Sequence, residues 1–207
     1  MYNILKYEKS DAGTSLFCLL FTGLLLSNFN ALAQKTTIWI VRHAEKDASS
    51  QGNDPVLSAE GQGRALALAK VLKHQNLKAI YVTSLKRTGI TAKPLAEQAK
   101  ILPRVYTDSL KQYANVILKN FKGKNVLIVG HSNTVMPLLA AFGAEPPFQQ
   151  LADDDYDMLF KIIVKDAGTV NLEVSYYGKS HHSSILPQRY LLENKEPQPF
   201  SRPVTNY

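Results

Sequence analysis

Two arginines and two histidines could act together chemically, because each lies at or just after the end of an apolar stretch. Arg42 and His43 end the run IWIVRH. Arg87 follows soon after the run KAIYVTS, and His131 ends the run NVLIVGH. Guanidinium groups bind phosphate oxygens in pairs, and a neutral imidazole can attack phosphorus to form a phosphohistidine. Brought to one point, these side chains would hold a phosphate dianion and present a nucleophile to it.

A folded sheet has to bring these residues together, because they are far apart in the chain. The three apolar runs have the length and composition of buried strands, and a short extended piece follows at 101–106. Between them, apolar residues recur at helical spacing, and Ser58 is placed to cap the first helix. We expect strands over 36–42, 78–84, 125–131, 157–165 and 169–177, and helices after Ser58, over 85–100, over 109–121 and after His131.

Apolar strands that alternate with amphipathic helices indicate an α/β fold. We predict a three-layer sandwich, with a mostly parallel central sheet, helices on both faces and antiparallel edge strands from the last two segments. Right-handed crossovers put the C-terminal ends of the parallel strands at one edge, and ligands bind beyond that edge. The two arginines and two histidines should therefore meet there. Backbone N–H groups of Ser132 and Asn133, at the start of a helix, would add to the anion site.

Phosphoryl transfer assigns each of these side chains a role. His43 is predicted to be the nucleophile, with the nearby arginines depressing its pKa and keeping it neutral. Arg42 and Arg87 would stabilise the charge of the transferring group, and a protonated His131 would hold a third oxygen. No cysteine ligand set and no H-x-x-x-H pair is present, so we expect no metal ion and no other cofactor.

Four blocks of the sequence resemble, in order and spacing, the histidine phosphatase superfamily of phosphoglycerate-mutase-like proteins. They are VRHAEK, LSAEGQGRA, TSLKRTGITAKPLA and VGHSN, within residues 36–142. The resemblance implies an α/β sandwich of the short, insert-poor branch, which hydrolyses phosphate esters through a phosphohistidine without metal. The family's phosphate-pocket residues match four positions of this chain: Arg42, His43, Arg87 and His131. The residue that would be phosphorylated is His43.

The proton donor is where the chain departs from many relatives. Those relatives place a glutamate soon after the second arginine's helix, or an aspartate directly after the second histidine, where this chain has Ser132. Asp108 is the acid in the first of these regions, but it also stands where it could cap the following helix. Glu45 leaves the same strand end as His43 and is the other candidate, unless it simply pairs with Lys46. With a good leaving group, the reaction would need no dedicated acid.

The other ionisable clusters have ordinary interpretations. The acidic run from Asp153 to Asp157 could border the pocket, although such runs are typical of solvated loops. His181 and His182 lie in a Ser-rich stretch, where we expect them to be solvated rather than to act as ligands.

The first 33 residues have the pattern of a cleavable secretory signal. Two lysines precede an apolar stretch from Leu16 to Leu26, and the small-residue sequence ALA ends at Ala33. The apolar stretch is shorter than the roughly 20 residues of a membrane span, and an uncleaved anchor is the alternative. Cleavage after Ala33 would also remove Cys18, the one cysteine of the chain. We expect one domain over 34–182, followed by an irregular tail over 183–207.

These observations predict an exported phosphomonoesterase, periplasmic or secreted, that acts on a small phosphorylated substrate without metal. The alternative is a family member with little or no turnover that binds phosphorylated glycans or lipid head groups. A mutase is less favoured, because the chain lacks a long insertion that would shield a phosphoenzyme from water. The net charge of +7 favours anionic ligands, but the lysines are scattered, so we expect no nucleic-acid partner. Nothing in the sequence specifies an oligomeric state.

Overall fold

The computed structural model describes residues 35–50, 52–107, 109–165 and 168–190, all within a compact unit that begins at Lys35. The predicted signal over 1–33, the candidate acid Asp108 and the tail from residue 191 lie outside the described residues. Among the helices of the described ranges, none is long and apolar enough to cross a membrane.

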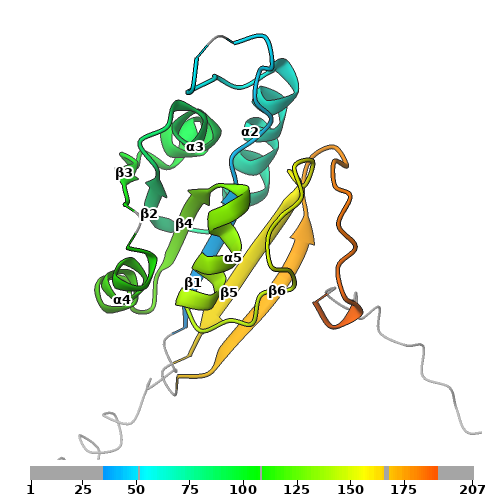
Figure 1. Cartoon of the computed structure of the whole chain (residues 1–207). Helices are drawn as coiled ribbons and strands as arrows, with labels where there is room; N and C mark the ends of the chain where they lie inside the picture. Colours follow the sequence, from blue (N-terminus) through cyan, green and yellow to red (C-terminus); the bar gives the residue numbers. More distant parts are fainter. Residues whose placement is uncertain (1–34, 51, 108, 166–167, 191–207) are drawn as a thin grey trace, which may run out of the picture. The chain divides into compact units, whose positions relative to one another are not determined.

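One mixed sheet of six strands organises the unit, in the order β3-β2-β4-β1-β5-β6 (Figure 1). Strands β1 to β4 pair in parallel, whereas β5 is antiparallel to β1, and β6 is antiparallel to β5. This confirms the expected largely parallel sheet with an antiparallel pair added at one side. The strands are β1 (Thr36–Arg42), β2 (Leu77–Val82), β3 (Arg104–Val105), β4 (Asn125–Gly130), β5 (Met158–Val164) and β6 (Val170–Tyr176).

Helices cover both faces of the sheet and complete the three layers. Side chains of α2 and α3 share one apolar cluster with the sheet, and side chains of α4 and α5 share a second cluster on the other face. The helices are α2 (Ala59–Leu72), α3 (Lys86–Ala99), α4 (Leu110–Asn120) and α5 (Ser132–Ala141), followed by a short 3-10 helix, η1 (Gln188–Tyr190).

Strand β1 shows why the central strands read as continuous apolar runs. Its side chains alternate between the two faces, as in any strand, so Ile38 and Ile40 pack under α4 and α5. Trp39 and Val41 pack on the opposite face with α2 and α3. Each fully buried aliphatic side chain contributes roughly 1.5–3 kcal/mol. The strand that ends at Arg42 is therefore held firmly from both sides.

Two element ends and the tail test the sequence predictions. Ser58 caps α2 as expected, since its Oγ accepts a hydrogen bond of 3.1 Å from the Gly61 N–H. The N-cap of α4 is Ser109. The expectation that Asp108 would occupy this position is therefore wrong by one residue. The described part of the tail is irregular except for η1, and its Tyr190 is buried.

Candidate active site

The C-terminal ends of β1 and β4 place the two histidines next to each other. Arg42 pairs with Gly130 in the parallel register of these strands. One residue further on, the His43 N–H donates to the Gly130 carbonyl over 2.9 Å. The rings of His43 and His131 then lie edge to face, with centroids 5.2 Å apart. Adjacent parallel strands thus bring together two residues that are 88 positions apart in the chain.

A cavity of about 510 Å³ opens at this edge of the sheet. The six residues predicted to contact phosphate all line it: Arg42, His43, Arg87, His131, Ser132 and Asn133. The wall also includes Lys46, Thr83 and Asp153, and Asp153 agrees with the suggestion that the acidic run could border the pocket. The structure therefore brings the predicted residues to one place, and their individual roles remain predictions.

The imidazole of His43 is buried and its orientation is fixed. Its Nδ1 lies 2.7 Å from the Ala44 carbonyl oxygen. Because a carbonyl can only accept, Nδ1 carries the proton, and this hydrogen bond assigns the tautomer that leaves a lone pair on Nε2. The Ala44 N–H is held in turn by Oγ1 of Thr91, from α3, at 2.9 Å. The nitrogen left without a proton is the one that a nucleophile requires.

The surroundings of His43 keep its imidazole neutral. Burial is the largest influence and lowers the pKa to about 3, against an opposing effect of the Ala44 carbonyl. The positive charges of Arg42 and Arg87 act in the same direction as burial, as does His131. The predicted direction of the pKa shift is therefore correct, but burial, rather than the arginines, has the larger effect.

This pKa predicts how stability depends on pH. Unfolded His43 titrates near its ordinary pKa of 6.5, and folded His43 near 3, so between these values only the unfolded chain binds the proton. The free energy of unfolding is therefore not reduced by His43 above pH 6.5. Between pH 6.5 and 3 it falls by about 1.4 kcal/mol for each unit by which the pH is lowered. His43→Gln removes this titration. Urea unfolding at pH 7, 6, 5 and 4 should show the variant gaining stability relative to the wild type at each lower pH, and parallel curves would contradict the prediction.

Arg42 is held by main-chain oxygens rather than by a carboxylate. Its Nη1 donates to the carbonyls of Ala152 and Asp153 at 2.7 and 3.0 Å. The guanidinium lies 4.0 Å above the ring of Tyr156, whose hydroxyl accepts from Nη2 at 3.3 Å. The guanidinium plane is therefore fixed before any ligand binds. This contact with Tyr156 could not be predicted from the sequence, since nothing local links β1 to residues 152–156.

Arg87 is held more loosely. It lies in the first turn of α3, and its Nη1 is 3.8 Å from Oδ1 of Asp54, with 16% of its side chain exposed. The carboxylate of Asp54 also accepts a hydrogen bond of 3.0 Å from the Lys86 N–H. The two predicted phosphate-binding arginines therefore differ in how strongly the fold constrains them.

His131 directly follows β4 and is the N-cap residue of the next helix. Its backbone N–H donates to Oγ1 of Thr134 at 2.8 Å, and its Nε2 is 3.0 Å from Oγ1 of Thr83. Ser132 and Asn133 form the first turn of α5 and line the cavity. A helix N-terminus with free N–H groups is a favourable place for an anion.

Glu45 is placed away from the cavity wall. Its carboxylate pairs with Nη2 of Arg64 at 2.6 Å and accepts a hydrogen bond of 2.8 Å from Nδ1 of His181. Burial acts to raise the pKa of Glu45, but the bonds from Arg64 and His181 outweigh it and lower the pKa. A permanently ionised, paired carboxylate argues against Glu45 as the proton donor. Its partner is also not Lys46, the alternative that the sequence had suggested.

Asp108, the other predicted acid, lies outside the described residues. Its described neighbours Thr107 and Leu110 both line the cavity. The role of Asp108 as the acid stays a prediction.

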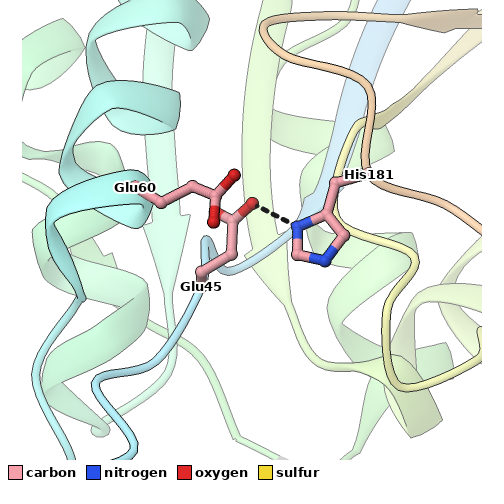
Figure 2. A group of neighbouring side chains, drawn as sticks. All are labelled: Glu45, Glu60 and His181. Atoms are coloured by element: carbon pink, nitrogen blue, oxygen red, sulfur yellow. Dashed lines mark hydrogen bonds and ion pairs between the residues drawn. The ribbon is translucent and has the colours of Figure 1, made fainter.

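Figure 2 shows Glu45 beside Glu60 of α2 and His181, with potential metal-binding atoms within 4.8 Å of one another. Arg64 already pairs with Glu45, and Lys179 lies 3.3 Å from Glu60. Since these two cations balance the charge of both carboxylates, we assign the cluster a structural role. It ties the chain after β1 to α2 and to the segment that follows β6.

The acidic run and the two C-terminal histidines are bonded to each other, contrary to expectation. Asp155 and Asp157 are fully buried, so the solvated-loop interpretation is wrong for both. The Asp157 carboxylate accepts from the His181 N–H at 2.8 Å and from Nδ1 of His182 at 2.7 Å. The two histidines are therefore partnered rather than merely solvated.

The structure is thus an α/β protein whose sheet edge carries a cavity lined by two histidines and two arginines. Residues 38–115 match the family model of the histidine phosphatase superfamily, branch 1. This match confirms, over residues 38–115, the resemblance to that superfamily.

One curated relative has a similar sequence over part of its length. The chain is 40% identical over 76 residues to phosphoserine phosphatase 1 of Hydrogenobacter thermophilus, a match that covers 34% of this chain and 36% of that protein. The chain thus spans about a third of the length of this relative.

Two solved structures show the same fold at low sequence identity. A mycobacterial glucosyl-3-phosphoglycerate phosphatase aligns with a TM-score of 0.55 and 17% identity, covering 70% of this chain and all of that one. A phosphoserine phosphatase from Entamoeba histolytica, in complex with 3-phosphoglyceric acid, aligns with a TM-score of 0.51 and 18% identity, covering 72% of this chain and 98% of that one. At such identities the likeness concerns the fold alone.

Proposed function

We propose that this protein is a phosphomonoesterase that hydrolyses small phosphate esters through a phosphohistidine on His43, without a metal ion. The observation that carries the proposal is the neutral imidazole of His43, oriented within a cavity that Arg42, Arg87 and His131 also line. The phosphoserine phosphatase among its relatives supports the class of substrate.

The reaction has two steps. In the first, Nε2 of His43 attacks phosphorus, the ester P–O bond breaks, and the leaving oxygen takes a proton. In the second, water attacks the phosphohistidine and the P–N bond breaks. This step releases inorganic phosphate and regenerates neutral His43. Arg42 and Arg87 stabilise the charge on the equatorial oxygens in both transition states. Asp108 is the candidate donor of the proton in the first step, and the candidate base for the water in the second.

We also propose that the protein is exported, on the basis of the signal-like sequence before Ala33. The N-terminal residue of the protein recovered from its native compartment tests this: Gln34 agrees with cleavage, and an intact start at Met1 contradicts it.

Trapping the covalent intermediate tests the proposed function directly. The purified protein is mixed with an aryl phosphate and a chelator, quenched in base and digested for mass spectrometry. We expect turnover that the chelator does not reduce, and an acid-labile, base-stable phosphoryl group on His43. Binding of inorganic phosphate without turnover would instead favour the glycan- or lipid-binding alternative. A phosphoryl group on another residue would contradict the assigned nucleophile.

A further inference from the structure

Three carbonyl groups of one short loop hold the guanidinium of Arg42. The loop comprises residues 152–156, and Nη1 of Arg42 donates to the carbonyls of Ala152, Asp153 and Asp155 at 2.7, 3.0 and 3.4 Å. Carbonyl groups are dipoles rather than full charges, so they orient the guanidinium without neutralising it. A carboxylate in their place would compete with a phosphate for the same cation. The 152–156 loop thus fixes the direction of Arg42 while its positive charge stays available.

The carboxylate of Asp155 in turn fixes the loop. Its Oδ2 accepts from the Ala152 N–H at 2.7 Å and from the Ser184 hydroxyl at 2.6 Å. Its Oδ1 accepts from the backbone N–H groups of Ser183 and Ser184, both at 3.0 Å. Asp155 is fully buried and receives four hydrogen bonds. It therefore closes the loop on itself and ties it to residues 183–184.

The environment of Asp155 keeps it ionised. Burial acts to raise the pKa of its carboxyl group, but the hydrogen bonds from Ser184, Ala152 and Ser183 outweigh burial and lower the pKa. Hydrogen bonds to a charged acceptor are stronger than neutral ones. The link from Asp155 to Ala152 is therefore a firm one, and the same Ala152 offers the shortest carbonyl contact to Arg42.

We propose that Asp155 is a positioning residue for phosphate binding, which acts on the ligand through the 152–156 loop and Arg42. This inference rests on the proposed function, because it assumes that Arg42 binds the transferring phosphate. The physical consequence is specific: loosening Asp155 lets the carbonyls of the loop shift, so the guanidinium no longer points at the phosphate oxygens. A misplacement of about 1 Å can cost on the order of 10²-fold in rate.

The chain supplies a matched control in the neighbouring residues. The Ser183 hydroxyl donates to Oδ1 of Asp154 at 2.6 Å, and the Ser184 hydroxyl donates to Oδ2 of Asp155 at the same distance. The Asp154–Ser183 pair is exposed at the surface. The Asp155–Ser184 pair is more buried, and its Asp155 also accepts a hydrogen bond from the Ala152 N–H. The two pairs offer the same chemistry and differ in their connection to Arg42.

The test compares Asp155→Asn with Asp154→Asn, and Ser184→Ala with Ser183→Ala. The readouts are the Kd for inorganic phosphate, kcat/KM for an aryl phosphate, and thermal unfolding. We expect Asp155→Asn to raise the Kd for phosphate by about tenfold or more, and Ser184→Ala to raise it by about threefold. Both control variants should stay within about twofold of the wild type. Should Asp155→Asn fail to fold, the two serine variants decide the question.

A double-mutant cycle separates positioning from general stability. In an Arg42→Ala background, neither Asp155→Asn nor Ser184→Ala should weaken phosphate binding much further. Equal losses in both backgrounds, or losses that match those of the control variants, would overturn the inference. Phosphate binding by the wild type without turnover would overturn the proposed function and leave this comparison valid. No phosphate binding by the wild type would overturn both.

Discussion

Replacing His43 by alanine is expected to abolish turnover, lowering kcat/KM for an aryl phosphate by about 10⁴-fold or more. The variant removes the nitrogen that we propose forms the covalent bond, and no phosphoenzyme should be trapped. Phosphate binding should largely remain, because Arg42 and Arg87 still line the cavity. Initial rates and phosphate affinity, measured on the same preparation, separate the loss of chemistry from the loss of binding.

External imidazole provides a second readout for the His43→Ala protein. The truncation leaves space where the ring had been, and added imidazole could attack the bound ester there, giving phosphoimidazole and partly restoring release of the aryl alcohol. His74→Ala is the matched control, since His74 is an exposed histidine that does not line the cavity. We expect it to keep wild-type activity. A His43→Ala protein that folds and keeps more than about a tenth of wild-type kcat/KM would show that His43 is not the nucleophile.

The sequence predicted the central strands well because their side chains are buried on both faces. The predicted strand 36–42 coincides with β1, and the predicted 125–131 exceeds β4 by the single residue His131. Apolar side chains on both faces leave little ambiguity of strand position. The start of α4 was harder to locate, because Asp108 and Ser109 are both common capping residues. Ser109 occupies the N-cap position, without a capping hydrogen bond from its side chain.

The meeting of the four predicted phosphate-binding side chains could be predicted because it follows from topology alone. Parallel strands end at one edge, and the sequence showed which residues stood at those ends. The neighbours of each side chain could not be predicted in this way. Glu45 had a plausible partner next to it in Lys46, yet its partner is Arg64, 19 residues away on α2.

The support of Arg42 was invisible in the sequence for the same reason. Its contacts lie 110 to 114 residues away, in a loop with no periodic pattern. One signal was present, however: Asp155 and Asp157 alternate with Tyr156 immediately before the apolar strand β5. Because side chains alternate between the two faces of a strand, acidic residues just before a buried strand can point inward, where each needs a hydrogen-bond donor. Most of these donors lie in residues 181–184, a stretch for which the sequence predicted no contact with the acidic run.

The second large effect is expected at Arg42, and the comparison with Arg87 gives it a physical test. Arg42→Lys should lower kcat/KM by about 10²–10³-fold, whereas Arg87→Lys should lower it by about tenfold. A lysine keeps the charge but has no rigid fork, so at position 42 it cannot bond the loop carbonyls and a phosphate in fixed directions. It would also leave the partly buried carbonyls of Ala152 and Asp153 short of donors, which costs stability. Arg87 has one long ion pair to Asp54 and therefore less prearranged geometry to lose.

The two lysine variants should also differ in the kinetic constant that changes. If Arg42 is held in place to meet the transition state, its loss should appear mainly in kcat, since charge on the equatorial oxygens increases as the ester bond breaks. The looser Arg87 should affect KM and kcat more evenly, because a mobile cation attracts the ground-state dianion almost as well. Steady-state kinetics with one aryl phosphate at a fixed pH measure both constants. The prediction would be contradicted by equal losses in the two variants, with the same division between kcat and KM. The loop carbonyls would then hold Arg42 for stability alone, and its guanidinium would have no catalytic advantage over that of Arg87.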